Sequence, residues 1–455
     1  MTRPRALLGS LIVADVAFAF LQTAIIPAIP VVRHDLAMSE AWSAWLLSAY
    51  LMVATAATPA LGRLADLYGR RRVLLVSLAT FLAGAVGAAL APGSAVLVFF
   101  RAVQGVGGAV FPLTFALVRE ELPAERVRLA IGTLTGAFGI GTALGFGLGG
   151  LLAVHLSWRV IFAAGACAVA LGTVLVARTV AARPGTAHGR FDLVGALLVG
   201  TAAVTLLLAL TFGTELGWAS PVPPVLFALS AGGWFWWARR ELTAADPLVD
   251  ITLFRIRSVV LANLATMGLG WAMFGAYLLL PDLLGAAPGR AGYGFGASAT
   301  VVGLCLLPAA AGQMVAGPLA VRAASVLGAR RVFAGGLALV ALALASLSVI
   351  RSGWPQLVAA VLVLGLGIGF AIQTSSAVVT EGVGAEHAAI STTLNSTIRR
   401  FAGGVGGQVS VGILAALTRG GGRTPAPAAF TLGFLVAAAM VAAGAGLAGA
   451  ARSTR

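Results

Sequence analysis

Two ionisable residues lie deep inside long apolar stretches of the chain, where a charge is costly. Asp15 stands within the stretch 7–30 and Arg101 within the stretch 95–118. A carboxyl group inside a membrane can take up and release a proton, whereas an arginine there costs roughly 2.5–3.5 kcal/mol on insertion scales and needs a partner or a cavity. Asp15 is therefore a candidate for proton uptake and release, and Arg101 is a candidate for a position that faces a cavity or a partner. The alternatives are a structural hydrogen bond for Asp15 and, for Arg101, a side chain that reaches the outer surface. Asp282 is a weaker candidate because it could simply reach water.

Other chemistries have no matching residues. The chain has no lysine, so it contains neither the G-x-x-x-x-G-K-[ST] loop that cradles nucleotide phosphates nor a lysine for a Schiff base. Cys167 and Cys305 stand in separate apolar stretches without CxxC spacing, and the four histidines are scattered in loops. We therefore expect no cofactor, no metal site, no catalytic residue and no enzymatic activity. Any transport would draw its energy from a gradient.

The elements that must position these residues are membrane helices. Of 455 residues, 59% are apolar and only 10% are charged, against about 25% charged in soluble domains. A helix of about 20 apolar residues crosses the roughly 30 Å hydrocarbon core and satisfies its own backbone hydrogen bonds. The sequence predicts an all-α integral membrane protein with fourteen such segments, at 7–30, 42–62, 73–91, 95–118, 129–152, 158–177, 191–212, 221–238, 258–281, 297–321, 332–350, 354–379, 389–417 and 427–450.

The arginines set the predicted orientation. With the N-terminus in the cytoplasm, the inner termini and loops carry 21 arginines and the outer loops carry six, which agrees with the positive-inside rule. This topology also explains the net charge of +15 without nucleic-acid binding. The first apolar stretch is longer than the core of a signal peptide. We expect a multi-pass protein of a bacterial cytoplasmic membrane, with both termini in the cytoplasm.

An internal repeat divides the chain. A shift of about 259 residues aligns Gly69-Arg70-Arg71-Arg72-Val73 with Gly328-Ala329-Arg330-Arg331-Val332. We predict an N-terminal six-helix bundle at 1–178, a two-helix insert with a cytoplasmic linker at 179–257, and a C-terminal six-helix bundle at 258–455. Parallel repeats of this kind place a substrate site near the bilayer midplane, between the halves. We expect the insert to pack outside them.

The loop after the second apolar segment reads Gly62-Arg63-Leu64-Ala65-Asp66-Leu67-Tyr68-Gly69-Arg70-Arg71-Arg72, and it resembles the gating loop of the major facilitator superfamily. Glycine allows a tight turn, a carboxylate can cap a helix N-terminus, and arginines anchor at an anionic leaflet. The resemblance implies a latch between the halves, made by Gly62, Asp66, Gly69, Arg70, Arg71 and Arg72. Asp66 would lie near 387–392 when the inner side is closed. The alternative is a positive-inside anchor alone, and in the second half Ser325 replaces the aspartate.

Two further motifs follow in the order found in that superfamily. Arg101-Ala102-Val103-Gln104-Gly105-Val106-Gly107-Gly108 resembles its second motif. The glycine series in the segment 129–152 is similar to its antiporter motif, although Phe146 stands where the motif has proline. Small residues at intervals of four let two helices approach closely. The series consists of Gly132, Gly141, Gly145, Gly149 and Gly150.

The end of the first segment, from Leu21 to Pro30, resembles the first-helix motif of the fourteen-helix drug:proton antiporters. The stretch Pro247-Leu248-Val249-Asp250 looks like their entry into the second half. The resemblance implies the major facilitator fold, with two six-helix bundles plus two extra helices. Gln22 stands where that family has an aspartate, so proton coupling would depend on Asp15 with Arg101.

The leading hypothesis is therefore a proton-coupled exporter, an antiporter of lipophilic drugs or metabolites. Its partners would be a small lipophilic substrate, protons and the lipid bilayer, and we expect a monomer. Aromatic surface with a few amides suits bulky apolar ligands. By family analogy the cavity is lined by Phe18, Gln22, Gln104, Phe111, Asn263, Trp271, Phe274, Phe370 and Gln373. The alternative is an importer or facilitator that binds an organic anion through Arg101.

Overall fold

The computed structural model describes residues 3–185, 191–244, 251–381, 383, 388–418 and 425–450, and these residues form helices with connecting loops. The first helices are α1 (Arg3–Thr23), α2 (Ile25–Asp35), α3 (Glu40–Ser43), α4 (Trp45–Tyr68), α5 (Arg70–Ala89), α6 (Ser94–Val106), the 3-10 turn η1 (Gly107–Ala109), α7 (Val110–Glu121), α8 (Ala124–His155) and α9 (Trp158–Thr179). The next are α10 (Leu193–Glu215), α11 (Val222–Thr243) and the 3-10 helix η2 (Ile251–Arg255). The last are α12 (Arg257–Gly285), α13 (Pro288–Ala291), α14 (Ala299–Leu327), α15 (Ala329–Leu347), α16 (Trp354–Thr380), α17 (Ala388–Ala416) and α18 (Pro427–Ala450).

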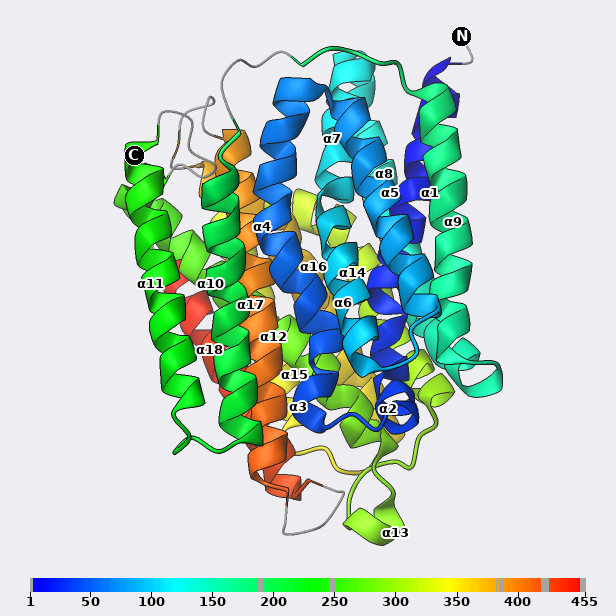
Figure 1. The fold of residues 1–455 in the computed structure, drawn as a ribbon, viewed down its shortest axis with the longest axis vertical. Coiled ribbons are helices and arrows are strands. Elements are labelled where there is room, and N and C mark those ends of the chain that lie inside the picture. The colour runs from blue at the N-terminus through cyan, green and yellow to red at the C-terminus, as the bar shows by residue number, and fades with distance from the viewer. Residues whose placement is uncertain are drawn as a thin grey trace.

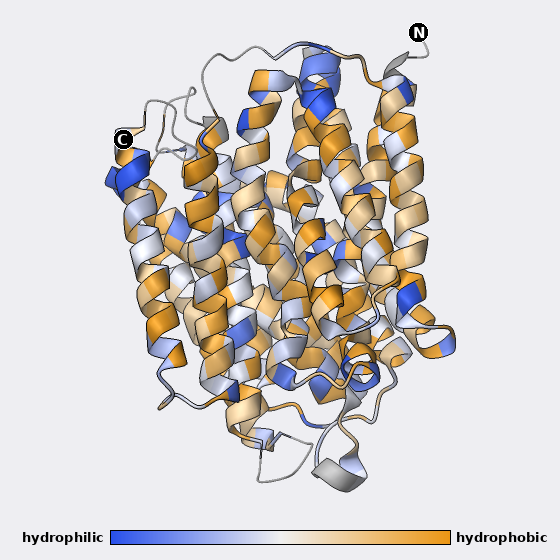
Figure 2. Ribbon diagram, viewed as in Figure 1, coloured by the Kyte–Doolittle hydropathy of each residue, from blue (hydrophilic) through white to orange (hydrophobic). Residues whose placement is uncertain are grey.

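The long helices stand side by side in one upright bundle (Figure 1). The start of α1 lies at the top of this view, and α2, α3 and α13 lie at the bottom. We name these the terminal end and the distal end. Apolar residues cover most of the helix surfaces between the two ends, and hydrophilic residues gather near both ends (Figure 2). This distribution is that of a bundle whose sides face hydrocarbon.

Twelve spans of the described chain are long and apolar enough to cross a membrane. They correspond to twelve of the fourteen predicted segments. The other two segments lie in α11 and α17, which are long helices of lower mean hydropathy. The α17 sequence holds Arg399 and Arg400, and α11 holds three tryptophans and two prolines. The all-helical prediction is confirmed, and the count of fourteen crossings stays a prediction.

Two predicted helices are interrupted. The first is divided at Ala24 into α1 and α2, because Pro27 has no N–H to bond the carbonyl of Thr23. The hydroxyl of Thr23 bonds the Ala19 carbonyl at 2.9 Å and holds the end of α1. The segment 95–118 is divided by η1, where Gly107 and Gly108 tighten the helix.

Helix packing repeats between the two parts of the chain. In the first part α1 packs on α8 and α9, α5 packs on α6 and α9, and α4 packs on α6. In the second part α12 packs on α17 and α18, α15 packs on α16 and α18, and α14 packs on α16. The two sets correspond one to one along the chain. The domain boundaries given above remain a prediction.

The two parts meet along two seams, α8 against α14 and α4 against α17. At the distal end α2 also packs against α12 and α14. The insert lies beside the α4–α17 seam, because α10 contacts both α4 and α17 and α11 packs on α10. The Trp45 indole N–H donates to the Thr211 hydroxyl at 2.9 Å, and the ring of Trp234 lies 5.2 Å from that of Phe401.

Candidate functional site

Asp15 is fully buried in the interior of the first part. The Thr114 hydroxyl oxygen of α7 lies 3.0 and 3.1 Å from the two carboxylate oxygens, and it also lies 2.8 Å from the Phe111 carbonyl. Within the described part of the chain no cation pairs with Asp15. A carboxyl group held by one hydroxyl suits a group that changes protonation, because an arginine partner would keep it charged.

Aromatic rings surround this position. Phe18, one turn from Asp15 on α1, lies 5.2 Å from Phe81 and 6.3 Å from Phe138, measured between ring centroids. Phe111 lies 4.7 Å from the same Phe138 ring. Two of the predicted cavity residues thus share one aromatic cluster with Asp15 nearby. Phe18 is fully buried within it, whereas Phe111 is half-buried.

Arg101 is also fully buried, but apart from Asp15. Its Nε donates to the Leu46 carbonyl at 2.7 Å and its Nη1 donates to the Gln104 side-chain oxygen at 2.6 Å. Its guanidinium carbon lies 5.3 Å from the centre of the Tyr50 ring. No carboxylate among the described residues pairs with Arg101. The structure therefore excludes a side chain that reaches the outer surface, and it does not bring Arg101 to Asp15.

Gln22 is half-buried on α1 and makes no hydrogen bond within the described chain. Gln104 is fully buried between α6 and α5, where a Cβ at Gly84 would lie 2.6 Å from its Cγ. The side-chain amide nitrogen of Gln104 has no partner among the described residues. Gln104 therefore supports Arg101 from within the first part.

The predicted cavity residues of the second part lie on α12 and α16. Asn263 accepts a hydrogen bond from Asn395 of α17 at 3.0 Å. Trp271 is half-buried with an unpartnered indole N–H, and the Phe274 ring lies 6.1 Å from that of Tyr277. Phe370 and Gln373 of α16 are half-buried.

Two functional candidates were not predicted as site residues, although both stand in the segment 389–417. Arg399 and Arg400 are half-buried on α17, and Arg400 donates from Nη1 to the Thr58 hydroxyl of α4. Neither arginine pairs with a carboxylate in the described chain. Two adjacent arginines within an otherwise apolar segment were the available signal.

The loop between α4 and α5 is built as its glycine predicts. Gly69 has φ +94°, and a Cβ there would overlap the Arg183 carbonyl oxygen. Arg70 donates from Nη1 to Glu120 at 3.2 Å, and its Nη2 lies 3.8 Å from Asp66. Arg71 donates to the Ala177 carbonyl at 2.7 Å. The loop thus ties α4, α5, α7 and α9 together at the terminal end.

Asp66 itself is 49% exposed. Its predicted partner region begins at His387, which lies outside the described residues. Gly62 is half-buried and Arg72 is exposed. In the second part Gly328 repeats the turn with φ +85°, and Arg330 lies 3.7 Å from Glu381. Ser325 stands in place of the aspartate, and in the described chain its hydroxyl donates to the Arg322 carbonyl at 2.7 Å.

The glycine series packs α8 on both of its neighbours. A Cβ at Gly141 would lie 2.5 Å from the Val16 carbonyl oxygen. Cβ atoms at Gly145 and Gly149 would overlap Thr23 and Ala24, also of the α1 side. Gly150 faces the other way, where a Cβ would overlap Ala299 of α14. Gly132 has no such neighbour within 4 Å, so the close contacts of this glycine series lie in the distal half of α8.

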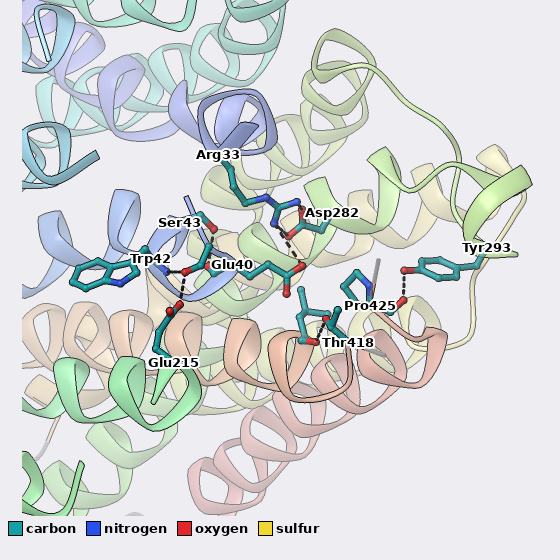
Figure 3. Close-up of polar contacts among 11 residues, drawn as sticks. Arg33, Glu40, Trp42, Ser43, Glu215, Asp282, Tyr293, Thr418 and Pro425 are labelled. Atoms are coloured by element: carbon teal, nitrogen blue, oxygen red, sulfur yellow. Dashed lines mark hydrogen bonds and ion pairs between the residues drawn. The ribbon is translucent and has the colours of Figure 1, made fainter. Parts of the chain in front are cut away.

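An ion pair joins the two parts at the distal end (Figure 3). Arg33 of α2 lies 2.9 Å (Nη2 to Oδ1) and 3.2 Å (Nη1 to Oδ2) from Asp282 of α12. The sequence suggested that Asp282 could simply reach water. In the structure it pairs with Arg33 instead, and only 10% of its side chain is exposed. Glu40 lies 4.0 Å from the same guanidinium. Burial and the nearby Asp282 charge raise the pKa of Glu40 to about 7, and Arg33 opposes that shift.

The described residues contain no group of three or more side chains that could hold a metal ion. What they do contain is the buried carboxyl group of Asp15, the arginines Arg101, Arg399 and Arg400 inside the bundle, and an ion pair that joins the two parts at one end. This set can bind protons and anions and can hold two halves together.

Known proteins share this architecture. A profile of the Major Facilitator Superfamily matches residues 11–407. Multidrug resistance protein Stp of Mycobacterium tuberculosis is 31% identical over 392 residues, 86% of this chain and 72% of that protein. Multidrug efflux pump LfrA of Mycolicibacterium smegmatis is 29% identical over 421 residues, 91% of this chain and 81% of that protein. The crystal structure of peptide transporter POT in complex with sulfate has a TM-score of 0.71 at 15% identity, over 99% of this chain and 94% of that one.

These matches confirm the resemblance that the three motifs indicated. The profile spans both parts of the chain, and the first of these relatives passes 30% identity over most of its length. The chain therefore belongs to the major facilitator superfamily, and it is a multi-pass membrane transporter, not an enzyme, that is similar to proteins named for multidrug resistance and efflux.

Proposed function

We propose that this transporter exports lipophilic compounds in exchange for protons. The observation that carries the proposal is Asp15, a buried carboxyl group without a cation, set beside aromatic rings in the first part. A buried carboxyl group of this kind can be protonated or ionised, and which form it takes depends on whether water reaches it from the inside or from the outside. Relatives named for multidrug resistance and efflux support the direction of transport.

The distribution of arginine supports placing the terminal end in the bacterial cytoplasm and the distal end outside. The protein would then lie in the plasma membrane as a monomer with fourteen crossings, two six-helix bundles and a two-helix insert. In this orientation the Arg33–Asp282 pair closes the outer side. The structure would correspond to an inward-facing state that is ready to receive substrate.

Transport would follow from competition between substrate and proton. Substrate enters from the inside, and the ion pair at the distal end opens as the halves rock about the α8–α14 and α4–α17 seams. A proton from outside then neutralises Asp15 and favours return. Thr114 accepts or donates a hydrogen bond according to that proton, so its hydroxyl fits both forms.

The direct experiment is substrate-dependent proton flux in liposomes that contain the purified protein. We expect a lipophilic substrate to release protons across the membrane in proportion to its transport. Asp15→Asn should abolish transport driven by a pH gradient while it leaves substrate binding largely intact. Thr114→Val, which removes the hydroxyl but keeps the carboxyl, should shift the pH optimum instead. Flux at the wild-type rate in Asp15→Asn would refute the assignment of the coupling group.

A second candidate function is uptake or facilitated passage of an organic anion. It is favoured by Arg101, which has no carboxylate partner in the described chain. Proton flux measured during transport separates the two, because only the antiporter moves protons in exchange for its substrate.

A further inference from the structure

The interior of the bundle carries an imbalance of charge. Arg101, Arg399 and Arg400 lie within the helices, and none of them pairs with a carboxylate in the described chain. Asp15, a buried carboxyl group of the first part, is held by Thr114 and pairs with none of these arginines in the described chain. Unpaired arginines in a membrane are costly unless they face water or an anion. We therefore expect an anionic group to bind in this interior.

Arg400 reaches across the seam between the two parts. It extends from α17 to α4, where the Thr58 hydroxyl accepts a hydrogen bond from Nη1 of Arg400. The same hydroxyl donates to the Ala54 carbonyl at 2.7 Å. Gly108 leaves the space, because a Cβ there would lie 3.3 Å from Nη1 of Arg400 and 2.6 Å from the Ala54 Cβ. Arg400 is thus placed against the segment that also carries Arg101, about two helical turns away.

Tyr50 interacts with both arginines. Its ring faces Arg101, with 5.3 Å from the guanidinium carbon to the ring centre, and its hydroxyl lies in the electrostatic field of both Arg400 and Arg101. Tyr50 is almost fully buried, yet its hydroxyl has no hydrogen-bond partner in the described chain. The same holds for Nη2 of Arg101 and for the amide nitrogen of Gln104.

These unpartnered atoms share one property, since each can donate a hydrogen bond. A buried donor without an acceptor is costly, and a ligand that brings oxygen acceptors removes that cost. We propose that Arg400, Tyr50 and Arg101 form a binding site for the anionic group, such as a carboxylate, of a lipophilic substrate. The inference rests on the proposed transport function and names the substrate class. Because the site draws on both halves, ligand binding would couple directly to their relative position.

The test uses a matched pair of probes, naphthalene-2-carboxylate and the neutral naphthalene-2-carboxamide, with purified protein in nanodiscs. Equilibrium binding should favour the carboxylate by about tenfold or more, as expected for one hydrogen-bonded charge pair. Arg400→Gln should reduce this preference to within about threefold. Arg400→Lys, which keeps the charge, should retain part of it. Tyr50→Phe keeps the aromatic ring beside Arg101 and removes the hydroxyl, so it should weaken the binding of the carboxylate probe only.

Arg399→Gln is the matched control, because it removes the same charge one residue away and Arg399 makes no hydrogen bond to α4 in the described chain. It should leave the preference unchanged. Equal affinity of the wild-type protein for both probes would overturn the proposal. So would a preference that survives Arg400→Gln, or one that Arg399→Gln removes equally. Proton flux driven by a neutral lipophile tests the proposed antiport separately. If this flux persists while the protein shows no preference for the anionic probe, only this site is wrong. Anion binding without any proton flux refutes the proposed antiport.

Discussion

Asp282→Asn should weaken closure of the distal end. The substitution keeps the shape of the side chain and removes the charge that Arg33 contacts at 2.9 and 3.2 Å. Hydrogen bonds between charged groups contribute about 1.5–3 kcal/mol each, but 24% of the Arg33 side chain and 10% of that of Asp282 are exposed, so solvent screens part of this energy. We expect the closed form to lose about 1–2 kcal/mol, a shift of about 5- to 30-fold toward the open form.

The assay is a distance measurement between spin labels on the two parts at the distal end. His34→Cys and Ala287→Cys place the labels on exposed positions of α2 and the loop after α12, in a background in which Cys167 and Cys305 are replaced by serine. The wild-type protein should show mainly one short distance. Asp282→Asn should raise the fraction of longer distances, and exchanging the charges with Arg33→Asp and Asp282→Arg should reverse that change in part.

Asp35→Asn is the matched control. Asp35 is a distal carboxylate as well, but it pairs with Arg159 at 3.4 Å and accepts from the Trp158 indole at 2.7 Å, both within the first part. Its loss should leave the distances unchanged. If Asp282→Asn leaves the distance distribution at that of the wild type, the ion pair does not hold the two parts together.

Three further predictions concern other residues. The pKa of Glu40 is raised from 4.5 to about 7 by burial in the closed form, and opening would return the carboxyl to water, so the closed form binds its proton more tightly. External acid should therefore favour closure, this stabilisation should be lost as the pH rises through about 7, and Glu40→Gln should remove the pH dependence of the label distances. Gly149→Val should lower the melting temperature of the purified protein, because even a Cβ overlaps Ala24, whereas Gly132→Val should not. Gln22→Asp should retain pH-driven transport in liposomes, and a complete loss would contradict a coupling role centred on Asp15.

Local features were readable from the sequence because they depend on neighbouring residues. The glycine at position 69 predicted a turn, and the structure shows the positive φ that only glycine adopts easily. The glycines at 141, 145 and 149 predicted close helix packing, and they lie against α1. Position 132 belongs to the same motif by sequence but has no neighbour within 4 Å, since spacing alone does not say how far the contact extends.

Contacts between residues that lie far apart in the chain could not be predicted from the sequence. Asp282 lies 249 residues from Arg33 and Asp15 lies 99 residues from Thr114, so neither pair leaves a local pattern. The insert was readable as two extra helices because the repeat is complete without them. The contact between α10 and α17, the helix that carries Arg399 and Arg400, could not be predicted. The reason is that α10 is too weakly amphipathic to indicate which helix it packs against.

The position of α10 removes the symmetry between the two sides of the transporter. The repeat gives two equivalent seams, α4 with α17 and α8 with α14, yet α10 contacts both helices of the first and α11 packs on α10. A molecule dissolved in the lipid meets the insert when it approaches the first seam and meets α8 and α14 themselves at the second. The α8 side of that second seam is lined by glycine, because a Cβ at Gly150 would overlap Ala299 and a Cβ at Gly147 would lie 3.6 Å from Leu307. In the proposed transport cycle we therefore expect lateral exchange with the bilayer at the α8–α14 seam, and we expect the two halves to slide along α10 at the other seam.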